Sequence, residues 1–118
     1  MKIPKILKIR RSKWTVDFDE TIEESYDAVG LCIRRSKRIL ISPNQTQAEI
    51  EDTLIHELLH ASWPDGICSD RLEEAIVSKL SRVFLGVLKD NNLLSQDNSG
   101  HEISARRRRR TYRYIRRT

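Results

Sequence analysis

The stretch TQAEIEDTLIHELLHAS, residues 46–62, carries the local signals of a helix with a defined beginning and end. Thr46 and Glu49 fit a capping box, in which a hydroxyl and a carboxylate reciprocally satisfy free amide groups at the start of a helix. The run WPDG at residues 63–66 interrupts the pattern. Apolar residues recur between these points at helical spacing: Ile50, Leu54, Ile55, Leu58, Leu59 and Ala61. We therefore expect one amphipathic helix that ends at about Ser62.

The same stretch contains HELLH at residues 56–60, which matches the metal-binding pattern HExxH. Residues four apart on a helix are separated by about 40° around the axis and about 6 Å along it. His56 and His60 can therefore direct imidazole nitrogens at one Zn²⁺. Glu57 lies beside such a metal, where it can act as the general base toward a metal-bound water. We interpret the motif as two zinc ligands and a base.

A catalytic zinc site normally has three protein ligands and one open position. Glu73 and Glu74, at the start of the next expected helix, are the candidates for the third ligand. Glutamates in a first helical turn often interact only with the helix dipole. Helical phase places Glu73 nearer the middle of the apolar stripe, so the spacing alone leaves both candidates open.

HELLH followed by Glu74-Ala75-Ile76 resembles the gluzincin pattern, in which a downstream glutamate, often followed by alanine, completes the zinc site. The order of strand, HExxH helix, short loop and glutamate-bearing helix is also similar to the minimal zincin core. Small bacterial and phage metallopeptidases, including the ImmA/IrrE-type group, have that layout. The resemblance covers about residues 30–90.

This resemblance implies a zinc metallopeptidase that hydrolyses a peptide or protein substrate. It implies His56, His60 and Glu74 as zinc ligands and Glu57 as general base, with Glu73 as the alternative third ligand. The chain departs from the larger gluzincins at one position. Those enzymes usually carry an acidic or amide residue four positions after the ligand glutamate, where this chain has Ser78.

The first half of the chain favours short strands. Together with the two helices expected after them, these strands predict an α+β fold with a minimal zincin-like core, in which a small antiparallel or mixed sheet packs on two helices. The acidic segment 19–27 indicates a turn or a short helix, and the basic residues 35–37 indicate a tight turn. In zincins the strand before the active-site helix lies at a sheet edge and typically pairs with extended substrate, so the resemblance implies this role for residues 38–42. The alternative is an ordinary core or edge strand. The segments expected as strands are residues 3–9, 13–18, 30–34 and 38–42.

A second helix is expected from Ser69 or Asp70 to about Leu88. Its apolar residues predict which face is buried. The predicted buried face consists of Leu72, Ile76, Leu80, Val83, Phe84, Val87 and Leu88.

The charged residues are distributed unevenly along the 118-residue chain. Residues 104–118 hold eight of the 22 basic residues and no acid, whereas residues 1–103 hold the other 14 together with all 17 acids. We expect a metallopeptidase domain at residues 1–92, followed at 93–118 by a polar linker and a disordered basic tail. Arginines interleaved with tyrosines favour non-specific binding of nucleic acid. The residues concerned are Arg106, Arg107, Arg108, Arg109, Arg110, Arg113, Arg116 and Arg117.

The tail motivates an alternative function, that of a non-catalytic zinc-containing protein that binds nucleic acid or regulates a partner. No apolar stretch is long enough to span a bilayer, and no secretory signal is recognisable, so we expect a cytoplasmic protein without a transmembrane segment. Cys32 and Cys68 are expected to be reduced thiols, because their spacing fits neither a zinc ribbon nor a redox motif. The sequence does not indicate an oligomeric state.

Overall fold

The computed structural model describes residues 1–93 of the chain, and the arginine-rich segment lies outside the described residues. Four strands form one mixed sheet in the order β1-β2-β4-β3. The strands are β1 (Ile6–Ile9), β2 (Ser12–Phe18), β3 (Gly30–Ile33) and β4 (Arg38–Ile41). β1 and β3 run antiparallel to their neighbours, whereas β2 and β4 are parallel. The α+β class is confirmed, and the sheet is mixed.

Three helices accompany the sheet, namely α1 (Ile22–Tyr26), α2 (Gln47–Ser62) and α3 (Asp70–Asp90). The predicted capping box starts α2: the Thr46 hydroxyl accepts a hydrogen bond from the Glu49 amide at 3.1 Å, and the Glu49 carboxylate accepts one from the Thr46 amide at 3.0 Å. Both predicted long helices are therefore confirmed, with α3 two residues longer than expected.

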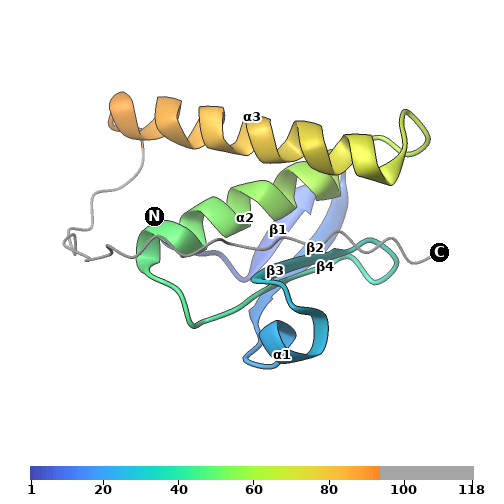
Figure 1. The fold of residues 1–118 in the computed structure, drawn as a ribbon, viewed down its shortest axis with the longest axis horizontal. Helices are drawn as coiled ribbons and strands as arrows, with labels where there is room; N and C mark the ends of the chain where they lie inside the picture. The colour runs from blue at the N-terminus through green and yellow to red at the C-terminus, as the bar shows by residue number, and fades with distance from the viewer. Residues whose placement is uncertain (94–118) are drawn as a thin grey trace.

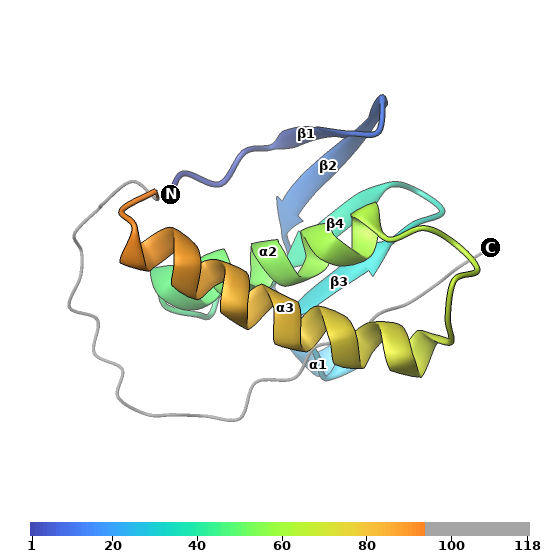
Figure 2. The same ribbon diagram turned by 90° about the horizontal axis from the view of Figure 1, so that it is seen from above.

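The elements stack in layers, with α3 on α2, α2 on the sheet, and α1 on the opposite face of the sheet (Figure 1). Successive side chains of a strand point to opposite faces of the sheet, so each strand contributes residues to both cores. Cys32, Ile39 and Ile41 face α2 in the larger core, whereas Leu31 and Leu40 pack toward α1 in the smaller one. The sheet therefore packs against one side of α2, and α3 lies across the other side of α2 (Figure 2).

The predicted buried face of α3 is wrong. The residues of α3 that are buried in the structure are spaced four apart, and two of the four are polar. They are Glu73, Val77, Ser81 and Leu85. Five of the predicted residues are instead exposed: Leu72, Leu80, Val83, Phe84 and Val87. The reason is that, among the described residues, α2 is the only element with which α3 makes extensive contact, and one neighbouring helix covers only a narrow stripe. Of the two polar side chains in that stripe, Glu73 contacts His60 of α2, and Ser81 donates a hydrogen bond to the carbonyl oxygen of Ser78 within α3.

The interpretation of residues 38–42 as an edge strand is also wrong. β4 lies between β2 and β3, so both of its sides are occupied by ladder hydrogen bonds. The strand at that edge of the described sheet is β3, which precedes β4 in the chain. Within residues 1–93, no helix is long and apolar enough to cross a membrane.

Candidate metal centre

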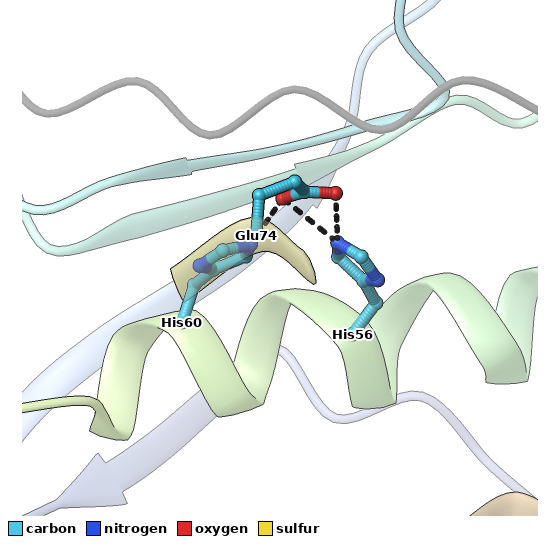
Figure 3. Close-up of side chains that lie close together, drawn as sticks. All are labelled: His56, His60 and Glu74. Atoms are coloured by element: carbon cyan, nitrogen blue, oxygen red, sulfur yellow. Dashed lines mark hydrogen bonds and ion pairs between the residues drawn. The ribbon is translucent and has the colours of Figure 1, made fainter. Parts of the chain in front are cut away.

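Two elements bring three side chains together at one point. α2 contributes His56 and His60 one turn apart, and the first turns of α3 contribute Glu74, whose carboxylate lies over both imidazoles (Figure 3). One donor atom from each of the three residues lies within 4.8 Å of the others, so the group could hold a metal ion. Both histidines are buried and Glu74 is half-buried.

The spacing of the donor atoms suits a small cation. A tetrahedral ion with bonds of about 2.0–2.1 Å separates its ligand atoms by about 3.3 Å. Glu74 Oε2 lies 3.2 Å from His56 Nε2, which matches that separation. Glu74 Oε1 lies 2.7 Å from His60 Nε2, which is the length of a direct hydrogen bond. A rotation of the carboxylate would open this second contact to ligand spacing.

The surroundings of His60 are compatible with a cation at one of its ring nitrogens. A neutral imidazole donates a hydrogen bond from one ring nitrogen only. Both nitrogens of His60 face carboxylate oxygens at 2.7 Å, Nδ1 toward Glu73 and Nε2 toward Glu74. One of these contacts therefore joins two acceptors unless a proton or a metal ion lies between them. The donor set accordingly fits a metal at the Nε2 side.

The electrostatics favour the forms that ligate a metal. Burial lowers the pKa of His56, an effect that its hydrogen bond to Glu74 opposes only in part, so the imidazole is neutral at pH 7. Burial alone would raise the pKa of Glu74, but the hydrogen bonds of His56 and His60 outweigh it and lower that pKa to about 2. Two imidazoles and one carboxylate form a donor set that suits Zn²⁺.

Glu57 is fully buried beside the cluster, and neither of its carboxylate oxygens has a hydrogen-bond partner among the described residues. Burial raises the pKa of Glu57 well above its usual value, and the charge of Glu74 adds to the effect. An unpaired carboxyl group in such a place costs several kcal/mol. Strand β3 approaches Glu57 closely: a Cβ atom added to Gly30 would lie only 2.8 Å from Glu57 Oε2.

The structure separates the two candidates for the third ligand. Glu74 joins the two histidines, whereas Glu73 contacts the opposite nitrogen of His60 and is fully buried. Glu73 lies in the buried stripe of α3, although the apolar residues that defined the predicted stripe are mostly exposed. Ser78, which stands where larger gluzincins have an acidic or amide residue, donates a hydrogen bond to Glu74 Oε2 at 3.1 Å.

Arg34, the residue directly after β3, contacts the surroundings of His60, and the sequence analysis did not identify it. Its Nη2 atom donates to the carbonyl oxygens of His60 at 2.8 Å and Trp63 at 2.9 Å, and its Nη1 atom donates to Asp65 Oδ1 at 3.0 Å. The same Nη2 lies 3.8 Å from Glu73 Oε2. No local pattern marks Arg34, because these side-chain hydrogen bonds join it to residues at least 26 positions away.

Comparison of the chain with protein-family models, with curated proteins and with solved structures gave no match. The likeness to gluzincins therefore stays at the level of the motif and its spacing. The predicted nucleic-acid-binding arginines, from Arg106 to Arg117, lie outside the described residues.

Proposed function

We propose that the chain is a zinc-dependent metallopeptidase that hydrolyses peptide bonds. The observation that carries the proposal is the buried, unpaired carboxyl group of Glu57 beside the cluster of His56, His60 and Glu74. A structural zinc site needs no acid–base group, and a merely packed helix gains nothing from an unpaired buried carboxyl. The combination instead matches the needs of hydrolysis, namely a metal-binding donor set with a base next to it.

In the proposed mechanism, one set of residues binds the metal ion and another residue transfers the proton. His56 and His60 would hold the ion from α2, and Glu74 would complete the donor set from α3, with its carboxylate oriented by Ser78. Zn²⁺ bound there would polarise the substrate carbonyl and lower the pKa of water toward about 7.

Glu57 would accept a proton from the attacking water and deliver it to the leaving amine nitrogen. Burial makes its carboxylate a stronger base than that of an exposed glutamate, and a neighbouring cation favours its ionised form. Since Glu57 is not part of the donor cluster, binding of the metal and transfer of the proton can be tested separately.

The test compares native protein with Glu57→Gln and His56→Ala variants. We expect about one zinc per chain in the native protein and in Glu57→Gln, and a loss of zinc in His56→Ala. A fluorescently labelled unfolded protein should be cleaved by the native chain only. Undiminished cleavage by Glu57→Gln would refute the proposed role of Glu57, and a native protein without zinc would refute the metal site.

A second candidate function rests on the eight arginines of residues 104–118. A segment of this charge binds nucleic acid through its phosphates, with an affinity that falls as salt rises. Removal of residues 104–118 should abolish such binding to single-stranded nucleic acid. Unchanged affinity and salt dependence in the truncated chain would exclude this function.

A further inference from the structure

The side of His60 that faces away from the candidate metal centre is occupied by charged groups whose position the donor cluster does not explain. Glu73 is fully buried there, with Oε2 2.7 Å from His60 Nδ1. Arg34 places its Nη2 3.8 Å from the same oxygen. We infer that Glu73 and Arg34 form a positioning pair that holds the His60 ring with Nδ1–H toward Glu73 and Nε2 toward the metal. The inference rests on the proposed zinc site.

The geometry of α3 explains how two adjacent glutamates serve one imidazole. Successive residues of a helix point about 100° apart. Glu73 and Glu74 therefore reach His60 from two directions, the first at Nδ1 and the second at Nε2, each at 2.7 Å. A hydrogen bond from the outer nitrogen of a zinc-bound histidine to a carboxylate fixes the tautomer and the orientation of the ring. Glu73 is placed to accept that bond.

Burial makes Glu73 an expensive side chain unless it is compensated. An ionised carboxylate removed from water costs several kcal/mol, and it persists in proteins only with charged or hydrogen-bonding partners. Arg34 provides a positive charge beside it, and the guanidinium is itself mostly buried. This pairing balances the charge of Glu73 without drawing on the charge of the metal.

Arg34 is held in place by contacts that do not involve Glu73. Its guanidinium donates to the carbonyl oxygens of His60 and Trp63 at the end of α2, and to Asp65 in the loop that follows. Arg34 thus fixes the last turn of the helix that carries His60 and, at the same time, approaches the carboxylate that orients the His60 ring. The Glu73–Arg34 pair thus connects the segment that follows β3 with the end of α2 and the start of α3.

The role differs from that of a ligand in what it predicts for zinc binding. Glu73→Gln keeps an oxygen that can accept from His60 Nδ1 but removes the charge. We expect the full-length variant to keep about one zinc per chain and to bind zinc about 10–100-fold more weakly, the effect typical of such outer partners. Arg34→Lys keeps the charge but loses the forked geometry, and a smaller loss of affinity is expected.

The matched control is Glu51→Gln, the same chemical change at a buried glutamate of α2 whose carboxylate pairs with the N-terminal amine, away from the cluster. Its zinc affinity should stay within about threefold of the native value. Affinities are measured by competition with a chromophoric chelator, and folding is checked by circular dichroism. The nitrogen-15 shifts of His60 report the tautomer, with Nδ1 protonated in the zinc-loaded native protein.

The outcomes separate the inference from the proposed function. Zinc bound by the native chain together with native affinity in folded Glu73→Gln overturns the inference and leaves the function intact. Loss of zinc in Glu73→Gln with retention in Glu74→Gln would make Glu73 the ligand and also overturns it. If Glu73→Gln does not fold, Arg34→Lys tests the pairing instead, because unchanged zinc affinity in that variant contradicts it. A native chain that binds no zinc refutes the proposed function itself.

Discussion

Replacement of Gly30 by alanine is predicted to damage the candidate base while it leaves the metal ligands in place. Gly30 is the first residue of β3 and packs against α2. A Cβ atom added to Gly30 would lie 2.5 Å from Thr53 Cγ2 and 2.8 Å from Glu57 Oε2. Ordinary contacts of this kind begin at 3.4 Å. Because Thr53 and Glu57 are both fully buried, neither can move aside into solvent.

The size of the effect follows from these overlaps. A Cβ at Gly30 comes about 0.9 Å too close to Thr53 and about 0.6 Å too close to Glu57. Overpacking of this kind costs about 1–3 kcal/mol of unfolding free energy. Each kcal/mol lowers the melting temperature by about 4–8 °C in a domain of this size. Misplacement of a catalytic group by about 1 Å can cost about 100-fold in rate, so hydrolysis should fall by about 10–100-fold.

The assay combines thermal unfolding, zinc content and peptide hydrolysis. Gly86→Ala is the matched control, because a Cβ on Gly86 meets nothing within 4 Å and α3 is helical there. This control should gain about 0.5–1 kcal/mol from the lower conformational entropy of the unfolded chain. If Gly30→Ala proved as stable as Gly86→Ala and hydrolysed peptide at the native rate, the close approach of β3 to Glu57 would be refuted.

Three further predictions concern the ligand, the thiols and the surface of α3. Glu74→Gln should bind zinc much more weakly than the native chain, measured by chelator competition, because a neutral amide replaces the carboxylate of the proposed third ligand; unchanged affinity would exclude Glu74 as that ligand. At pH 8, a thiol reagent should label half-buried Cys68 in the native state and Cys32 only after unfolding, since burial raises the pKa of the Cys32 thiol far above its usual value; equal labelling rates would contradict this. Val83→Lys should change the unfolding free energy by less than about 0.5 kcal/mol, because Val83 is 58% exposed. Val77→Lys should cost several kcal/mol by burying a charge, and a denaturant titration of both variants checks the order.

The half of the candidate site that α2 contributes could be predicted from local sequence. A capping box, an apolar stripe and a loop signal define α2, and each involves residues within one helix. The His56–Glu57–His60 spacing then follows from helix geometry alone. For the same reason, the hairpin turn and the bounds of the strands were predicted within a few residues, as these signals lie within short segments of chain.

The choice between Glu73 and Glu74 required the packed structure. Both residues lie in the first turns of α3, and the sequence leaves open which of them joins the two histidines. The answer depends on the rotation of α3 about its axis where it crosses α2, and contacts between the two helices set that rotation. The same rotation exposes Val83 and its apolar neighbours while Glu73 is buried, opposite to the order that hydrophobicity predicts.

The sequence by itself thus determined that His56 and His60 lie on the same side of one helix, because residues four apart on an α-helix are neighbours on its surface. The sheet order, which places β4 inside and β3 at the edge, and the approach of Arg34 to Glu73 were set by contacts between segments far apart in the chain. No periodic pattern encodes such contacts, since they arise when the sheet, α2 and α3 bury their faces together. Only that packing brings Glu57, the cluster of His56, His60 and Glu74, and the Glu73–Arg34 pair together in one place.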